Sequence, residues 1–224
     1  MPKFIDIHTH NQTTEENTLK IINAPQVHGS FGQASGLFSL GLHPWYLDKN
    51  TFENDFQTLE QSSKNQNIIM IGECGLDRNI DVNFEFQKEV FIRQIQLAEH
   101  LQKPVIIHCV RAFPDIISIK KKIQPSVPMI IHGFNNNLQI YQQLIEHQFY
   151  ISLGSALLNP NSNASKVIKM IPKEKLFLET DDKNCTISSI FALASAYSNA
   201  PIEILQEIII NNFNRIFSNQ NLET

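Results

Sequence analysis

The amino-acid sequence predicts an α/β fold, a (β/α)₈ TIM-type barrel that is abbreviated or distorted near its amino-terminal strands. Short apolar runs rich in β-branched residues occur eight times along the chain, and longer stretches with helical periodicity mostly separate them. This alternation is typical of a parallel sheet with crossover helices. The chain has 224 residues, fewer than the roughly 250 usual for this barrel, so we expect one side of it to be shortened.

The eight predicted strands are short, and glycine, proline or polar residues interrupt the chain around them. They comprise residues 3–8, 19–24, 37–43, 68–75, 104–109, 128–134, 150–154 and 176–181. The first two runs are closer together than the roughly one dozen residues that a parallel crossover needs. We therefore expect a loop to replace a helix, or the second strand, in this part of the chain.

The clearest predicted helix covers residues 84–102. Val90, Phe91 and Ile95 fall on one face of it, and charged residues such as Lys88 and Arg93 fall on the other. Weaker patterns of the same kind predict further helices at residues 52–64, 113–122, 138–147, 164–171, 187–198 and 201–217.

Composition limits the classes of protein to which the chain can belong. The 22 acidic and 18 basic residues give a net charge of -4, which excludes a strongly basic protein that coats nucleic acid. No apolar run approaches the roughly 20 residues that span a bilayer. The three cysteines lack the spacing of a disulfide framework or a thiolate zinc site. We expect one cytoplasmic domain covering residues 1–224, with no membrane contact and no obligate protein partner.

Histidines and carboxylates recur where the predicted strands end. Asp6, His8 and His10 alternate along the first strand, so an extended chain points all three to one face. Similar side chains end four later strands, namely Glu73, His108, His132 and Asp181. If the strands are parallel, these groups meet at the carboxyl-terminal rim, where barrel enzymes build their sites.

Imidazole and carboxylate ligands suit divalent ions such as Zn²⁺, Mn²⁺ or Mg²⁺. We expect two ions: His8, His10 and Asp181 would hold one of them. His108 and His132 would hold the second ion, and Glu73 would bridge the pair. Two ions about 3.5 to 4 Å apart polarise a substrate oxygen and activate a water, so the site predicts a hydrolase in which Glu73 and Asp181 are catalytic.

Six motifs in order carry a family resemblance. They are Asp6-x-His8-x-His10, Gly41-Leu42-His43-Pro44, Gly72-Glu73-x-Gly75-Leu76-Asp77, Pro104-Val105-x-Ile107-His108, Ile131-His132-Gly133-Phe134 and Glu179-Thr180-Asp181. The chain closely resembles the TatD-related family of metal-dependent deoxyribonucleases. The resemblance implies a TIM-type barrel, a centre of one or two ions, and hydrolysis of phosphodiester bonds in DNA or short oligonucleotides. It assigns the ligand roles to the six residues named above.

Two departures from the family pattern affect the predicted substrate pocket. Val110 occupies the place of a common family arginine, and Arg111 follows one position later. Asp182 and Lys183 stand where the family commonly has a small residue and proline. Two alternatives therefore stay open, a metal-dependent hydrolase of a small amide, ester or lactone, and a weakly catalytic protein that binds a nucleotide or a partner.

Several residues are predicted to support the site. Asp6 and Glu179 each precede a predicted ligand by two residues, and we expect them to orient their neighbours. His43 is expected either to contact substrate phosphate or to cap a turn, and Arg111 either to hold phosphate or to form a surface ion pair. The single tryptophan, Trp45, is expected either to stack on a base or to pack in the protein.

Overall fold

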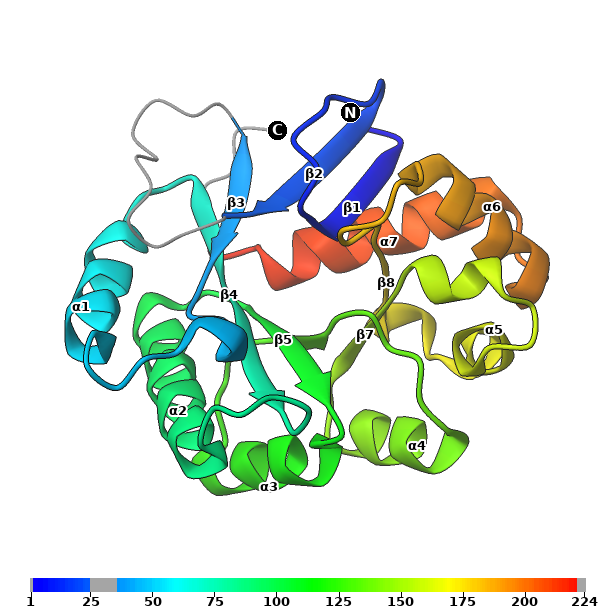
Figure 1. Ribbon diagram of the computed structural model, residues 1–224. Helices are drawn as coiled ribbons and strands as arrows, with labels where there is room; N and C mark the ends of the chain where they lie inside the picture. Colours follow the sequence, from blue (N-terminus) through cyan, green and yellow to red (C-terminus); the bar gives the residue numbers. More distant parts are fainter. Residues whose placement is uncertain (1, 25–35, 221–224) are drawn as a thin grey trace. The chain divides into compact units, whose positions relative to one another are not determined.

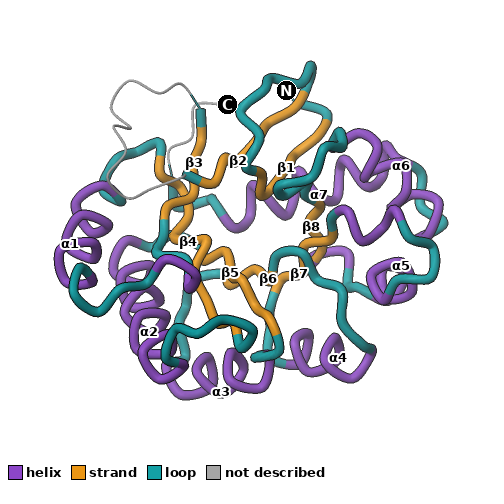
Figure 2. Tube along the Cα trace, viewed as in Figure 1, coloured by secondary structure: helices purple, strands orange, loops and turns teal. Residues whose placement is uncertain are grey.

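A computed structural model describes residues 2–24 and 36–220 (Figures 1 and 2). In these residues eight strands form one sheet, with neighbours in the order β1 to β8. An isolated parallel bridge between Thr9 and Asp181 also joins the end of β1 to the segment after β8. This sequential order is that of a (β/α)₈ barrel, so the predicted fold class is confirmed. The strands are β1 (Phe4–Thr9), β2 (Thr18–Asn23), β3 (Leu37–Leu40), β4 (Ile68–Asp77), β5 (Val105–Val110), β6 (Met129–Ile131), β7 (Tyr150–Leu153) and β8 (Leu176–Leu178).

The chain divides into two compact units, one made of Met1–Ile21 and Ile130–Thr224 and the other of Ile22–Met129. The boundaries fall inside β2 and β6. The single domain expected for residues 1–224 stays a prediction.

In the unit Ile22–Met129, β3 pairs in parallel with β4, and β4 with β5. Helices α1 (Phe52–Ser62), α2 (Phe84–Leu101) and α3 (Phe113–Ile123) alternate with these strands (Figure 2). The α2 helix packs on β4 through its predicted apolar face, where Val90, Phe91 and Ile95 are buried. Its start is set by Asn83, whose side chain accepts a hydrogen bond from the Phe86 amide.

The other unit contains β1 and the parallel strands β6, β7 and β8. Their helices are α4 (Leu138–Glu146), α5 (Asn163–Val167), α6 (Ile187–Ser198) and α7 (Ile202–Ile216), joined by the 3-10 turns η2 (Ser155–Leu158), η3 (Ile168–Met170) and η4 (Lys173–Lys175). The α6 and α7 helices contact both β1 and β8. Phe191 of α6 meets Phe4 of β1 edge to face, with ring centroids 5.1 Å apart.

Several predicted elements differ in extent from the structure, and the strands expected over residues 128–134 and 176–181 end at Ile131 and Leu178. The third strand was expected over residues 37–43 but ends at Leu40, and Pro44 begins a 3-10 turn, η1 (Pro44–Tyr46). The helix expected over residues 164–171 divides into α5 and η3, and Pro172 follows closely. Between β1 and β2 the chain forms a loop in place of a helix, as the short spacing predicted.

The connection from β2 to β3 lies almost entirely outside the described residues. Among the helices of residues 2–24 and 36–220, none combines the length and the apolar composition needed to cross a membrane.

Candidate metal centre

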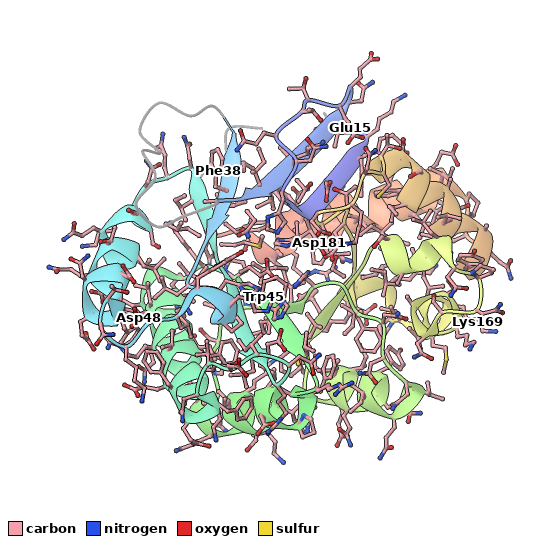
Figure 3. All side chains as sticks on the ribbon, viewed as in Figure 1. Glu15, Phe38, Trp45, Asp48, Lys169 and Asp181 are labelled. Atoms are coloured by element: carbon pink, nitrogen blue, oxygen red, sulfur yellow. The ribbon has the colours of Figure 1, made fainter. Side chains whose placement is uncertain are left out.

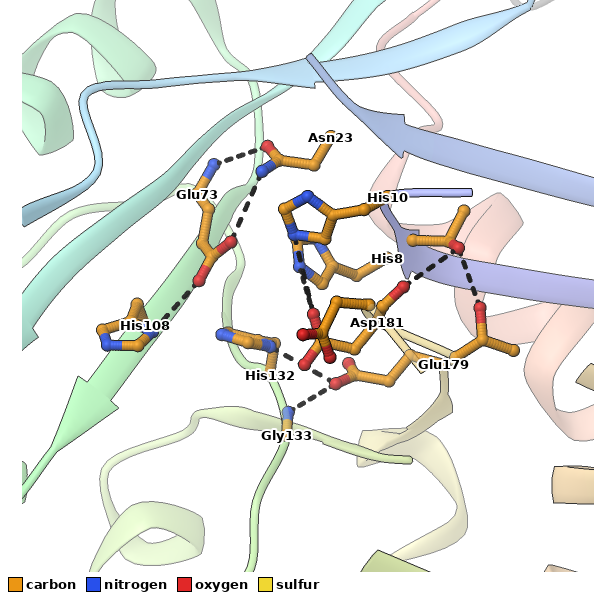
Figure 4. Close-up of polar contacts among 12 residues, drawn as sticks. His8, His10, Asn23, Glu73, His108, His132, Gly133, Glu179 and Asp181 are labelled. Atoms are coloured by element: carbon orange, nitrogen blue, oxygen red, sulfur yellow. Dashed lines mark hydrogen bonds and ion pairs between the residues drawn. The ribbon is translucent and has the colours of Figure 1, made fainter. Parts of the chain in front are cut away.

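His8, His10 and Asp181 lie together where β1 ends and where the chain leaves β8 (Figure 4). The Nε2 atoms of both histidines lie 3.6 Å from Oδ1 of Asp181. The backbone holds them in place, because the Asp181 amide donates to the His8 carbonyl and the His10 amide donates to the Asp181 carbonyl, each at 3.0 Å. Two segments far apart in sequence therefore present three possible ligands to one another.

His132 and Glu179 extend this group. His132 Nδ1 lies 3.3 Å from Glu179 Oε1, and the Gly133 amide donates to the same oxygen at 2.6 Å. The rings of His8 and His132 have centroids 4.6 Å apart. Ligand atoms of His132, Glu179 and Asp181 all lie within 4.8 Å of one another. We call this set the His8 cluster; it comprises His8, His10, His132, Glu179 and Asp181.

One oxygen of the His8 cluster shows that the cluster suits a cation. Glu179 is fully buried, and its Oε2 has no hydrogen-bond donor within residues 2–24 and 36–220. A buried carboxylate oxygen without a donor is costly. A divalent ion would satisfy it, and the imidazole and carboxylate donors around it are those that such ions prefer.

Asp6 supports the turn that carries two members of the cluster. Its Oδ1 accepts from the Thr180 amide at 3.0 Å, and its Oδ2 accepts from the Thr180 hydroxyl at 2.6 Å. Burial raises the pKa of Asp6 to about 7, although these hydrogen bonds act in the opposite direction. Because Thr180 stands between Glu179 and Asp181, Asp6 positions both carboxylates through the backbone.

A second group surrounds Glu73 of β4. Glu73 Oε1 lies 3.1 Å from His43 Nε2 and 3.0 Å from His108 Nδ1. The other ring nitrogen of His108, Nε2, lies 3.1 Å from Asp77 Oδ2. We call this set the Glu73 cluster; it comprises His43, Glu73, Asp77 and His108.

His108 shows that this cluster also suits a cation. Both of its ring nitrogens face carboxylate oxygens, but a neutral imidazole carries one ring proton and can donate to only one of them. A second proton or a metal ion would satisfy the other contact. Burial raises the pKa of Asp77, but hydrogen bonds from Trp45, the Asn79 amide and His108 outweigh it and hold the pKa below its ordinary value.

An irregularity in β4 determines where Glu73 points. Ile71 is opposite Val105 of β5, but Cys74 is opposite Ile107, so β4 contains one more residue than β5 in this interval. Such a bulge re-aims a side chain. Asn23 at the end of β2 then fixes the carboxylate, because its Oδ1 accepts from the Glu73 amide at 3.2 Å and its Nδ2 lies 3.4 Å from Glu73 Oε2.

The glycines of the motifs allow this close packing. A Cβ on Gly41 would lie 2.5 Å from the Cα of Gly72, and a Cβ on Gly75 would lie 2.0 Å from the carbonyl oxygen of His108. Gly75 also has a φ of +147°, which side-chain-bearing residues rarely adopt. The Glu73 cluster is thus built on strands that approach too closely for any side chain at these positions.

The two predicted phosphate-binding residues occupy different surroundings. His43 does cap a turn, since its Nδ1 accepts from the Trp45 amide at 3.2 Å, and it also belongs to the Glu73 cluster. Arg111 directly follows β5, is exposed, and has a φ of +53°. No ion pair of Arg111 occurs in the described part of the chain, so its guanidinium is available to a ligand.

The sequence reasoning missed two contributions. Asn23 was not named, although it ends a strand as the predicted ligands do, and applying the same rule to amide side chains would have found it. The bond from Trp45 Nε1 to Asp77 Oδ2, at 2.7 Å, gave no sequence signal because the two residues are distant in the chain.

Parallel strands that end in histidines and carboxylates define a class of barrel proteins that hold divalent metal ions at the strand ends. The family model "TatD related DNase" matches residues 30–218. The chain belongs to this family.

An uncharacterized metal-dependent hydrolase of Bacillus subtilis is 34% identical over 146 residues, which are 64% of this chain and 57% of that protein. The chain thus spans little more than half the length of this relative. A human 3'-5' RNA nuclease is 31% identical over 149 residues, covering 64% of this chain and 19% of that protein. The crystal structure of YjjV, a TatD homologue of Escherichia coli, superimposes with a TM-score of 0.84 at 23% identity, covering 96% of this chain and 98% of that one.

Proposed function

We propose that the chain hydrolyses phosphodiester bonds of DNA or short oligonucleotides with the help of divalent metal ions. The observation that carries the proposal is the set of histidines and carboxylates at the strand ends, including a fully buried Glu179 oxygen without a donor in the described residues. The family description names deoxyribonucleases, and the human relative is named an RNA nuclease. Both names support nucleic acid as the substrate class.

The proposed ligands are those expected from the sequence. His8, His10 and Asp181 would hold one ion, His108 and His132 would hold a second, and Glu73 would supply a carboxylate to both. The strand order supports this assignment, because the carboxyl ends of sequential parallel strands in a barrel share one rim. Zn²⁺, Mn²⁺ and Mg²⁺ are the candidate ions. When bound, such ions supply a Lewis acid for the phosphoryl oxygen and an activated water.

The chain's own groups orient the reaction. Asp181 is partly exposed and close to two imidazoles, so it is the carboxylate that accepts a proton from the attacking water. Glu73 is nearly buried between His43 and His108 and holds their rings. Arg111 offers a planar donor fork to a phosphate.

The net charge of -4 favours a short contact with substrate. Extended duplex binding requires many cationic contacts that release counterions, and this chain has more acidic than basic residues. Short strands and strand ends are therefore the proposed targets.

The test compares two substrate classes on one protein. Purified protein is loaded with Mn²⁺, Zn²⁺ or Mg²⁺ and assayed on bis(p-nitrophenyl) phosphate, on labelled single strands, and on a panel of amides and lactones. We expect hydrolysis of the phosphodiesters that a chelator abolishes and that Glu73→Gln, a variant of matched size, greatly reduces. Faster hydrolysis of a carbonyl substrate than of any phosphodiester would contradict the proposal and favour a hydrolase of small amides, esters or lactones.

A further inference from the structure

Trp45 is a large apolar side chain that is exposed to solvent beside the Glu73 cluster. It lies in η1 and is 54% exposed, although its indole N–H already donates to Asp77 Oδ2 at 2.7 Å. Burying a tryptophan is among the most favourable contacts a protein can make. Its polar atom is satisfied while its ring is open to solvent, so the exposed part of Trp45 offers apolar surface alone.

Two hydrogen bonds fix Trp45, one at its backbone and one at its indole N–H. The Trp45 amide donates to His43 Nδ1, and Asp77, which accepts from the indole, is also 3.1 Å from His108 Nε2. The ring centroids of His43 and His108 lie 5.1 and 5.9 Å from that of Trp45, with interplanar angles of 88° and 80°. An aromatic ring anchored in this way loses little entropy when a ligand packs on it.

Tyr46 adds a second open ring. It is 78% exposed, and its centroid lies 5.7 Å from that of His43. Among the large apolar side chains that the described residues expose, only Trp45 and Tyr46 are aromatic, and they are consecutive. Figure 3 shows Trp45 among the labelled side chains.

We infer that Trp45, with Tyr46 beside it, stacks on an unpaired nucleobase of a single-stranded substrate and so presents the neighbouring phosphate to the Glu73 cluster. This inference rests on the proposed phosphodiesterase function. Every base has a π-face, so stacking tolerates any sequence. A base inside a duplex is already stacked on its neighbours, so the ring pair selects single strands and frayed ends.

The experiment compares a single-stranded DNA trimer with the same trimer built from abasic sugars, which carries the same phosphates. A chelator prevents hydrolysis during binding. Trp45 is the sole tryptophan of the chain, so its fluorescence reports directly on the proposed site. We expect the normal trimer to quench this fluorescence and the abasic trimer to leave it unchanged. We expect the normal trimer to bind about 5- to 100-fold more tightly.

Variants are compared by the ratio of the two dissociation constants, measured by anisotropy of labelled trimers. Trp45→Ala should bring the ratio close to one. Trp45→Phe keeps one flat aromatic ring but loses the second ring of the indole and its N–H, so it should preserve part of the ratio. Leu158→Ala removes another exposed apolar side chain and should keep the wild-type ratio. A Trp45→Ala protein with the wild-type ratio, or a wild-type ratio of one with unchanged fluorescence, would overturn the inference.

Adding metal back separates this inference from the proposed function. Hydrolysis of both trimers at equal efficiency, with no base preference in binding, would reject stacking and leave the phosphodiesterase proposal standing. Base preference in binding without hydrolysis of either trimer would support stacking and reject the phosphodiesterase. If Trp45→Ala does not fold, judged by circular dichroism, the wild-type fluorescence and Tyr46→Ala decide the question, because Tyr46→Ala should lower the ratio.

Discussion

At the residue scale, shared oxygen atoms organise the site. Glu73 Oε1 meets two imidazoles, and Glu179 Oε1 meets the His132 ring and the Gly133 amide. Because His43 Nδ1 accepts from the Trp45 amide, a neutral His43 carries its proton on Nε2 and donates it to Glu73. One backbone amide thus sets the tautomer of a side chain in the Glu73 cluster.

Glu73→Ala should lower kcat/KM on bis(p-nitrophenyl) phosphate more than Asp6→Ala does. Asp6 acts through Thr180, and loss of such a supporting contact costs about 10- to 100-fold. Glu73 contacts two histidines directly, so its loss should exceed that range and lower the bound metal, measured by elemental analysis. Wild-type activity and metal content in Glu73→Ala would remove it from the centre.

Arg111→Ala should raise KM for an oligonucleotide by about tenfold or more, which corresponds to about 1.4 kcal/mol. The side chain is exposed, so stability and metal content should not change. Arg78→Ala is a matched control, because Arg78 already pairs with Asp115 at 2.8 Å. A KM equal to that of the wild type would show that phosphate recognition does not use Arg111.

At the element scale, β4 supplies two residues of the Glu73 cluster, Glu73 and Asp77. All of its residues from Ile68 to Asp77 are buried. Its glycines allow close packing against β5, and its bulge lets Glu73 and Asp77 both contact His108. A strand of this kind tolerates no added atom where its backbone meets that of its neighbour.

Gly75→Ala should therefore destabilise the protein by more than about 2 kcal/mol, because the new Cβ overlaps the His108 carbonyl and also forces a strained φ. Gly133→Ala is the control. Its φ of +56° is also strained for alanine, but its Cβ would meet only Glu179 Oε1 at 3.6 Å, so about 1 kcal/mol is expected. Urea unfolding measures the stability of both variants. Equal losses of unfolding free energy would show that the backbone moves to avoid the overlap at residue 75 without further cost.

The start of β4 is tied to the end of α1 by Lys103. Its Nζ donates to the carbonyls of Ser63 and Ile68, each at 2.5 Å. Burial lowers the pKa of Lys103 to about 8 from 10.5. Between these two values the unfolded chain binds more protons than the folded chain, so this group increases stability as the pH rises through that window.

Lys103→Met should destabilise the protein at pH 7 by about 1 to 3 kcal/mol, because buried carbonyls lose a charged donor. The gap between the unfolding free energies of wild type and variant should widen from pH 8 to pH 10, since only the wild type has the contribution of Lys103. Denaturant unfolding at both pH values measures the gap. Lys49→Met serves as the surface control, because Lys49 is exposed and its Nζ has no hydrogen bond or ion pair to the described residues, only a contact with the Phe86 ring. A gap that narrows with pH would contradict the assigned pKa direction.

At the scale of the whole molecule, metal binding should couple to folding. Ligands that bind only the folded chain stabilise it by about 2.7 kcal/mol at 100 times Kd. For a chain of this size that amounts to a rise of about 5 to 10 °C in Tm. Scanning calorimetry with Zn²⁺ or Mn²⁺, and then with a chelator, should show this rise and its reversal.

The same measurement on Asp181→Asn should show a smaller metal-induced rise, because this variant loses an anionic ligand near His8 and His10. Asp182→Asn, a change at the next residue that pairs only with Lys183 among described groups, is the matched control and should keep the wild-type rise. An unchanged rise in Asp181→Asn would exclude it as a ligand.

The sequence by itself determined the order of the strands and the polar residues at their ends. Most of the strands are short apolar runs that are largely buried, as β4, β6, β7 and β8 are along their whole length, so local pattern suffices to locate them. His8, His10 and Asp181 were predicted together because strand ends in a parallel sheet share one edge. The boundaries at residues 43 and 171 were wrong because local turn and proline geometry, not hydrophobicity, ends those elements.

Only the tertiary structure decided which groups touch. The bulge in β4 directs Glu73 toward His43 and His108, and no apolar pattern in the sequence records a one-residue insertion against a neighbouring strand. The contact between Trp45 and Asp77 likewise depends on how η1 meets the end of β4. Side-chain pairing depends on ångström-scale backbone placement, which packing across distant segments sets, whereas strand formation depends on composition averaged over several residues.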